Sequence, residues 1–343
     1  NGFPGLAFFR SSAKGSGLPR FRQGRRRHIT VPATTREHPA LIELWIPITI
    51  FAAFMQNLRS ALQKHLKGRL SNGGATYVRF LYSLPFSLIY LWAVYTFGGY
   101  AIPEANWLFM LYCLLGGLSQ ILFTFLLVYL FSFRNFAVGT IYSKTEIVQV
   151  AFLGLILLGD TISDTALVAI AIGMAGILTL SVAQTTVTWK SLFTSVFERP
   201  TMIGLVCGAF LGASVVFYRG ASLSLGDDPA IMRAAYALAV SVSMQTVIMG
   251  AYLLAREPGQ MTAVFTHWKP SLAVGIAGVL GSIGWFTAFS LQNAAYVRAL
   301  GQIELVFTFI ASVFFFKEKT NRLELCGIAL VVGAILILVL GQA

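Results

Sequence analysis

The chain has 343 residues, of which 57% are hydrophobic and 11% charged, and its formal net charge is +12. With a mean hydropathy of +0.75, this composition excludes a soluble globular domain and predicts an all-α integral membrane protein. Three cysteines without CxxC spacing and four scattered histidines offer neither a disulfide framework nor a metal site, so we expect no metal and no cofactor.

Residues 1–42 differ from the rest of the chain. They contain eight basic residues among Gly, Ser and Pro, without an apolar period: Arg10, Lys14, Arg20, Arg22, Arg25, Arg26, Arg27 and Arg36. This composition predicts a disordered basic tail, and an arm that binds lipid headgroups or nucleic acid is the alternative. The segment has neither an initiator Met nor the apolar core of a secretory signal, so an upstream extension is a further interpretation.

Ten apolar windows follow, each close to the ~20 residues that cross about 30 Å of hydrocarbon as a helix. The apolar runs are continuous, whereas the strands of a membrane barrel alternate between apolar and polar residues, so we expect helices. Breaks rich in Gly, Pro or charge separate the windows, which cover residues 44–63, 75–97, 106–131, 135–158, 164–184, 200–221, 230–254, 270–290, 295–316 and 322–341.

The two halves of this apolar region repeat each other at an offset of 158 residues, which places Glu146 on Glu304 and Asn135 on Asn293. Each copy contains five windows, and because five is odd the second copy must enter the membrane from the opposite side. The sequence therefore predicts ten transmembrane helices in two inverted five-helix repeats, residues 43–185 and 186–343. Inverted repeats commonly bind a solute between the halves, near the midplane.

Three features of each copy resemble the EamA type of the drug/metabolite transporter superfamily. A basic residue closes the first helix, an arginine lies early in the second, and an acidic residue follows the fourth: Arg59, Arg79 and Asp160 in the first copy, Arg219, Arg233 and Glu318 in the second. The resemblance covers residues 44–341. It implies a secondary transporter of small organic metabolites, an exporter, in a bacterial inner membrane.

The fourth helix of each copy departs from this family pattern. The family commonly has a proline near its middle, where this chain has Glu146 followed by Ile147 and Glu304 followed by Leu305. The kink that a proline produces by removing a backbone hydrogen bond is therefore not assured by the sequence.

Glu146 and Glu304 are the candidate coupling residues. A carboxylate at mid-span costs about 2.5–3.5 kcal/mol even on the lenient insertion scale, and a short acidic side chain cannot reach the headgroups. Each glutamate therefore needs a partner or water. It either forms a salt bridge with an arginine of a neighbouring helix, or it binds the substrate or takes up a proton, because burial disfavours the charged form.

Lys144 and Arg298 are the basic residues nearest to these glutamates in sequence. Lys144 is two residues from Glu146, and Arg298 is six residues from Glu304, so neither pair shares one helix face. Each basic residue therefore needs a partner elsewhere. Both could contact a substrate carboxylate, or they could flank the entrance of the span, and the sequence favours neither role.

Other side chains could complete a site or serve packing. Tyr142, Tyr296 and Trp285 could form the walls of a pocket, and Gln120 could donate hydrogen bonds within the bundle. Arg59, Arg79, Arg219 and Arg233 are expected to be structural charges that reach headgroups or water from near the ends of their spans, although a basic interior would favour anionic solutes. Gly204, Gly208 and Gly212, at a spacing of four, are expected to form a close-packing edge.

The chain contains no phosphate-binding loop of the GxxxxGK[ST] type, so the energy for transport would come from an ion or solute gradient. The expected partners are a small solute, membrane lipid and protons. A homodimer would add a second copy of the chain, and nucleic acid is not expected as a partner. Two other classes stay open: a scaffold or sensor that does not transport, and a lipid-modifying membrane enzyme. The basic loops place both termini outside the cell, whereas the family resemblance places them inside.

Overall fold

The computed structural model of the protein describes residues 39–66, 69–130, 133, 136–185, 188–314, 317 and 320–341, all in the compact unit His38–Ala343. The tail expected over residues 1–42 lies outside the described residues except for residues 39–42, which already belong to the first helix. The described residues form helices and no strand: α1 (Pro39–Leu66), α2 (Asn72–Leu81), α3 (Leu84–Gly98), α4 (Trp107–Leu130), α5 (Phe136–Ser143), α6 (Glu146–Leu158), α7 (Asp164–Ala183), α8 (Trp189–Thr194), α9 (Arg199–Ser224), α10 (Ala230–Arg256), α11 (Pro258–Thr266), α12 (Trp268–Leu291), α13 (Ala294–Gly301), α14 (Ile303–Phe314) and α15 (Arg322–Leu340).

Eight helical stretches of the described chain are long and apolar enough to cross a membrane. They correspond to eight of the ten expected windows, and the windows 44–63 and 295–316 are not among them. The first is covered by α1, whose second half carries polar residues such as Gln56 and Asn57. The second is divided between α13 and α14, and its last two residues lie outside the described chain. The protein is therefore a multi-pass, all-helical membrane protein, and a count of ten spans stays a prediction.

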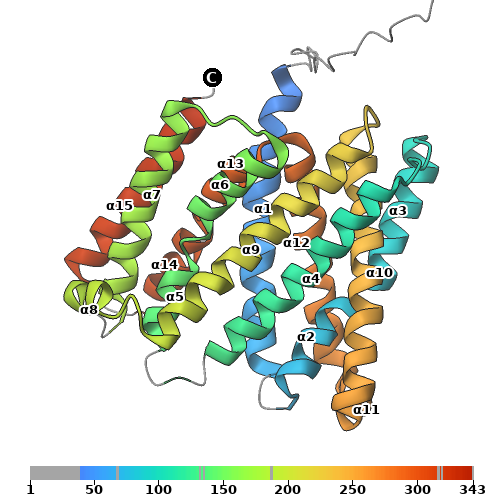
Figure 1. The fold of residues 1–343 in the computed structure, drawn as a ribbon, viewed down its shortest axis with the longest axis horizontal. Coiled ribbons are helices and arrows are strands. Elements are labelled where there is room, and N and C mark those ends of the chain that lie inside the picture. Colours follow the sequence, from blue (N-terminus) through green and yellow to red (C-terminus); the bar gives the residue numbers. More distant parts are fainter. Residues whose placement is uncertain are drawn as a thin grey trace, which may run out of the picture. The chain divides into compact units, whose positions relative to one another are not determined.

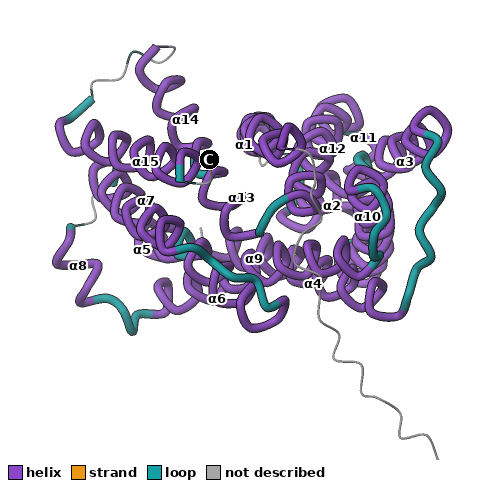
Figure 2. Tube along the Cα trace, turned by 90° about the horizontal axis from the view of Figure 1, so that it is seen from above, coloured by secondary structure: helices purple, strands orange, loops and turns teal. Residues whose placement is uncertain are grey.

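The long helices pack in three principal pairs: α4 along α9, α12 along α1, and α15 along α7. Figure 1 shows α9 crossing the bundle between α5 and α6 on one side and α4 on the other, with α7 and α15 side by side at its left. Figure 2 shows α6, α9 and α13 in the middle of the same bundle. In Figure 1 the chain of α1 runs from the upper to the lower edge, and α9 begins at the lower edge.

Glycines allow α9 to approach α5 and α6 closely. A Cβ atom on Gly204 would collide with the backbone of Gly139 in α5, and one on Gly208 would meet the carbonyl oxygen of Ser143 at 2.8 Å. Gly212 faces Val150 of α6 in the same way. The expected close-packing edge is thus confirmed, and its partner is the fourth helix of the first half.

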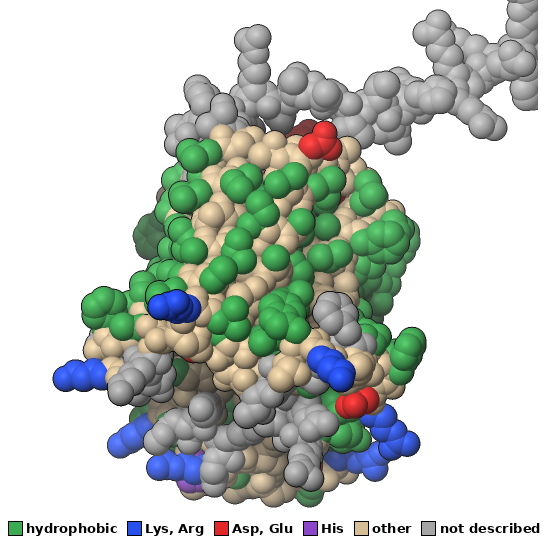
Figure 3. Space-filling view, turned by 90° about the vertical axis from the view of Figure 1, so that its left-hand side faces the viewer, with side chains coloured by type: hydrophobic (Ala, Val, Ile, Leu, Met, Phe, Trp, Pro, Cys, Tyr) green, Lys and Arg blue, Asp and Glu red, His purple; other side chains and the backbone are tan. Residues whose placement is uncertain are grey.

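The surface of the bundle is apolar where lipid would contact it. Figure 3 shows hydrophobic side chains over the face formed by α7 and α15, with lysine and arginine side chains gathered toward its lower end. Large side chains such as Val168 and Leu336 are 53% exposed, which a protein in water would avoid over so wide an area. This distribution fits an apolar band between two polar edges.

The contact between Gly204 and Gly139 gives a first prediction. Gly204→Ala adds a methyl group where no space exists, so we expect it to destabilise the protein by about 1–3 kcal/mol, the usual range for overpacking. Gly333→Ala in α15 is the matched control, because nothing lies within 4 Å of a Cβ atom at that position. Thermal unfolding in detergent measures both variants, and equal midpoints for the two would contradict the close approach.

Candidate functional site

The fourth helix of each half is interrupted at its middle, without a proline. The first consists of α5 and α6, with a break at Lys144 and Thr145, and the second consists of α13 and α14, with a break at Gln302. At both breaks the backbone bonds are of the tighter i→i−3 kind: the amide of Thr145 donates to the carbonyl of Tyr142 at 3.1 Å, and that of Gln302 to Ala299 at 3.2 Å. A break therefore occurs at the position where the sequence, lacking the family's proline, did not assure a kink.

Polar side chains account for the two breaks. The hydroxyl of Thr145 donates to the Tyr142 carbonyl at 2.7 Å, and the side-chain amide of Gln302 donates to the Arg298 carbonyl at 3.3 Å. These carbonyls are the ones that a continuous helix would pair with the amide four residues later. Side chains of this kind compete with the helix for its own backbone groups, so a threonine and a glutamine do here what a proline does elsewhere.

The breaks place Glu146 and Glu304 in the first turns of α6 and α14. Unpaired amide groups at a helix N-terminus carry a partial positive charge, which favours a carboxylate. Both glutamates are buried, with 1% and 7% of their surface exposed. They therefore lie deep in the protein, as the repeat predicted, but at the starts of half-helices.

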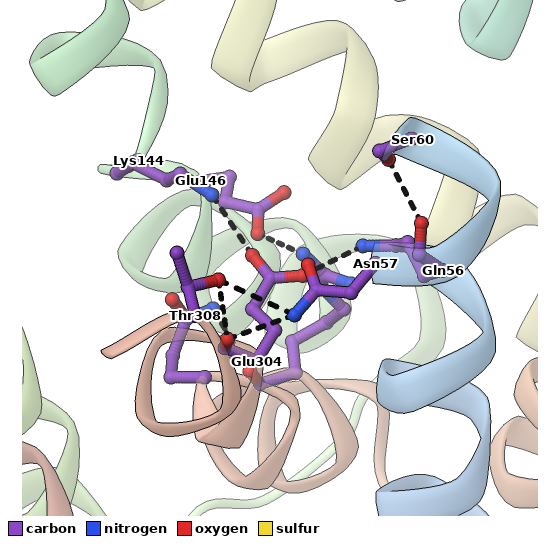
Figure 4. A network of polar contacts seen from close by, with 9 residues as sticks. Gln56, Asn57, Ser60, Lys144, Glu146, Glu304 and Thr308 are labelled. Carbon is purple, nitrogen blue, oxygen red and sulfur yellow. Dashed lines mark hydrogen bonds and ion pairs between the residues drawn. The ribbon is translucent and has the colours of Figure 1, made fainter. Parts of the chain in front are cut away.

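Two ion pairs cross between the halves of the chain (Figure 4). Lys144 Nζ lies 2.9 Å from Glu304 Oε1, and Arg298 Nη2 donates to Glu146 Oε1. The prediction that each basic residue needs a partner on another helix is confirmed. The partner in each case is a distant glutamate, 160 residues from Lys144 and 152 residues from Arg298 in the sequence.

The Glu304 carboxylate is also bound by α1. Gln56 Nε2 donates to Glu304 Oε2 at 2.9 Å, and Asn57 Nδ2 donates to the Glu304 backbone carbonyl at 2.9 Å. Thr308 Oγ1 donates to the same carbonyl at 2.9 Å. Both oxygens of this carboxylate therefore have partners, one from α1 and one from the break between α5 and α6. Sequence reasoning had not singled out Gln56, although a glutamine within an apolar span was the available signal.

The Glu146–Arg298 pair is drier and less completely satisfied. Within the described chain, Glu146 Oε2 and Arg298 Nε have no hydrogen-bond partner. The guanidinium group of Arg298 lies over the Trp285 ring, 5.0 Å from its centroid. Lys144, by contrast, keeps 31% of its side chain exposed. The Glu146–Arg298 pair is thus buried, and the Lys144–Glu304 pair is partly exposed.

The remaining expected site residues are distributed over several places. Trp285 joins the site through Arg298, whereas Tyr296 forms hydrogen bonds with Ser163 at the start of α7, at 3.0 Å to its amide and 3.3 Å to its hydroxyl. Tyr142 packs in a small apolar cluster with side chains of α7. Gln120 lies in a second polar cluster, where its Oε1 accepts from Gln245 at 2.8 Å. These three residues do not join the crossed ion pairs.

Two of the four arginines expected to be structural charges have structural contacts. Arg219 binds Asp160 with both Nε and Nη2, at 3.0 and 3.3 Å, and its Nη1 donates to the carbonyls of Phe289 and Gln292. Arg233 Nη1 donates to the carbonyl of Gly226 at 2.9 Å. Among the described residues no side-chain hydrogen bond or ion pair involves Arg59 or Arg79. No group of three or more His, Cys, Asp or Glu residues that could hold a metal ion occurs among the described residues.

The different burial of the two crossed pairs gives a second prediction. Glu146→Gln leaves a buried arginine without its carboxylate, so we expect a loss of about 3–5 kcal/mol in the free energy of unfolding. Lys144→Gln should cost less, because Lys144 is partly exposed and Glu304 keeps its bond from Gln56.

The double variant Glu146→Leu with Arg298→Leu is the control, since replacing a whole buried pair by apolar side chains is commonly close to neutral. Thermal unfolding of the purified protein compares the three variants. A double variant less stable than Glu146→Gln would contradict this account of the pair.

Comparisons with known proteins agree with this description. Residues 199–340 match the model of the EamA-like transporter family. One solved crystal structure has a TM-score of 0.62 at 14% sequence identity, over 87% of this chain and 96% of that chain, which is a likeness of fold. No curated protein matches the sequence. Residues 199–340 are thus similar to a family that is part of the drug/metabolite transporter superfamily.

Proposed function

We propose that the protein is a secondary active transporter that exports small organic solutes across a bacterial inner membrane by alternating access. The observation that carries this proposal is the crossed arrangement of Lys144–Glu304 and Arg298–Glu146 at two interrupted helices. Each ion pair joins one half to the other, so a rocking motion between the halves must either break a pair or turn about it. Broken helices at a buried polar site are common where transporters bind their solutes and ions.

An inverted repeat of residues 43–185 and 186–343 is part of this proposal. It is supported by helix contacts that occur twice, once in each direction between the halves. The third helix of the first half, α4, packs along α9, the first helix of the second, and α12 packs along α1 in the reciprocal contact. The opposite edges at which α1 and α9 begin in Figure 1 support the inversion. With α13 and α14 counted as one interrupted span, each half contributes five.

Glu304 is the proposed coupling residue, and the Glu146–Arg298 pair is the proposed fixed contact. Breaking a buried ion pair by removing one partner costs about 3–5 kcal/mol, so the step that separates the halves must neutralise the released carboxylate. A proton arriving on Glu304 would do so, and its partner Lys144 is 31% exposed. The side chains of the Glu146–Arg298 pair are only 1% and 5% exposed.

A transport assay tests the proposed coupling. The solute is first selected by thermal stabilisation of the purified protein across amino acids, nucleosides, organic acids and cationic drugs, because a bound solute stabilises the folded state. Its uptake into proteoliposomes is then measured against pH. We expect Glu304→Gln to remove the pH dependence and to lower the rate by at least about tenfold, whereas the exposed Glu104→Gln should leave both unchanged. Unchanged rates and pH dependence for Glu304→Gln would reject the coupling role.

The distribution of charge gives a prediction of orientation. Basic residues in loops, in the short helix α8 and at helix ends lie at the edge where α1 and α10 end and where α12 and α15 begin: Arg69, Lys190, Arg199, Arg256, Lys269, Lys317 and Arg322. Basic loops face the cytoplasm, and α15 ends at the opposite edge (Figure 1). We therefore expect green fluorescent protein fused after Gly341 to stay dark and alkaline phosphatase fused there to be active. A fluorescent fusion at that point would show that the family-based orientation holds instead.

A further inference from the structure

Two arginines of the bundle interior lack a carboxylate partner. In the described chain the ion pairs are Lys144–Glu304, Arg298–Glu146 and Arg219–Asp160. They leave Arg59 in α1 and Arg79 in α2 without an acidic side chain within 4.0 Å. Arg59 Nε is buried and has no hydrogen-bond partner among the described residues. The guanidinium group of Arg79 lies over the neighbouring Phe80 ring, 5.5 Å from its centroid.

The two arginine side chains lie beside each other. A Cβ atom on Gly278 of α12 would lie 3.6 Å from Arg59 Cδ and 3.8 Å from Arg79 Cγ, so both stems pass over the same glycine. Their charges repel each other at this separation. Two like charges without a counter-ion inside an apolar bundle are destabilising. The protein therefore maintains a concentrated positive charge at a point where its own carboxylates do not neutralise it.

Of the two arginines, Arg79 lines a small cavity between α2, α4, α10 and α12, where polar side chains lie beside it. The residues that line it are Arg79, Phe80, Ser83, Gln120, Leu238, Val242, Gln245, Ser282 and Phe286. Gln245 Nε2 donates to Gln120 Oε1 at 2.8 Å and to the hydroxyl oxygen of Tyr218 at 3.1 Å. These contacts fix the orientation of the Gln120 amide, and its Nε2 has no hydrogen-bond partner among the described residues. A donor therefore lies in the same cavity as Arg79.

We propose that Arg59 and Arg79, with Gln120, bind the anionic group of the transported solute, a carboxylate or a phosphate. Planar guanidinium groups present paired N–H donors that match the oxygens of these groups. The lining also contains Phe80, Phe286 and Leu238, which suit the apolar part of a small organic anion. This inference rests on the proposed transport function and names the class of its solute.

The same position links the anion to the crossed ion pairs. Arg59 is one turn from Gln56 on α1, and Gln56 holds the carboxylate of Glu304. Glu304 also attracts Arg59 across the intervening space. An anion that binds Arg59 competes with Glu304 for this positive charge, so binding of the solute weakens the hold of α1 on α14. A solute of opposite charge would have the reverse effect.

Thermal unfolding of the full chain in nanodiscs of pure phosphatidylcholine tests this site. The probes are matched pairs that differ in charge: succinate and succinamide, glycerol 3-phosphate and glycerol, with inorganic phosphate as the smallest anion. We expect at least one anion to raise the midpoint by roughly 5 °C at about 100 times its Kd, and its neutral counterpart to leave it unchanged. Equal responses to the charged and neutral members of every pair would overturn the proposal.

Two substitutions distinguish a binding role from a structural one. Arg59→Gln and Arg79→Gln should each weaken anion binding by about tenfold or more, because a charge-assisted hydrogen bond is lost. Each should also raise the midpoint of the ligand-free protein, since one of two repelling charges is removed. The exposed Arg322→Gln is the control and should change neither value. A lowered ligand-free midpoint together with unchanged anion binding in both variants would show that the arginines only support the fold.

Additional measurements distinguish a lipid headgroup from a free solute as the source of the anion. They also test the anion site and the transport function separately. If the headgroup of an anionic lipid is the ligand, phosphatidylglycerol in the nanodisc should stabilise the protein and remove the effect of the free anions, and the solute assignment fails. Anions that bind through both arginines but are not moved in proteoliposomes would reject transport and retain the site. Transport that depends on Glu304 but moves a neutral or cationic solute would reject the anion site alone.

Discussion

The ion pair between Arg298 and Glu146 constrains the rest of the structure. Its side chains are 5% and 1% exposed and come from α13 and α6, in different halves of the chain. Removing two charges from water costs several kcal/mol for each ion, and their attraction compensates for this only at close range. The halves must therefore dock in one register, in which each glutamate meets the basic residue of the other copy. The glycine edge of α9 packs against α5 and α6 and so holds one member of each pair in place.

Repeat-related arginines have acquired different surroundings in the two halves. Arg219 is neutralised by Asp160 and two backbone carbonyls, whereas its counterpart Arg59 has no such partner among the described residues. Arg233 donates to a carbonyl near a helix end, whereas its counterpart Arg79 lines a cavity. A duplicated framework thus carries one structural pair of arginines and one pair that is available to a ligand. This asymmetry gives a symmetric bundle a single place to hold an anion.

Much of this arrangement could be predicted from the sequence. Composition and apolar windows predicted a helical membrane protein, and the spacing of Glu146 and Glu304 predicted two related buried acids. The breaks at Thr145 and Gln302 were missed, because they depend on which backbone carbonyl a side chain reaches and not on a residue type that breaks helices. Cross-pairing could not be predicted either, since it depends on how distant helices dock.

The four arginines that the sequence groups as structural charges have different surroundings for a related reason. A sequence shows a charge within a span but not whether a carboxylate faces it, so Arg219 and Arg59 looked alike until the fold separated them. Gln120 was selected for its polarity, and its position beside Arg79 instead of Glu304 follows from the packing of α4 against α9 and α10. Side chains whose role depends on a distant partner are the ones that sequence patterns describe least well.

The crossing of the ion pairs also matters for how the chain is made. Arg298 follows Glu146 by 152 residues, and the ribosome adds about 5–20 residues per second. For roughly 8–30 s after its synthesis, Glu146 is therefore present without the positive charge of Arg298. During that interval protonation, water or an insertion factor must shield the carboxylate, so nascent chains stalled between these two residues should be the forms most exposed to membrane quality control.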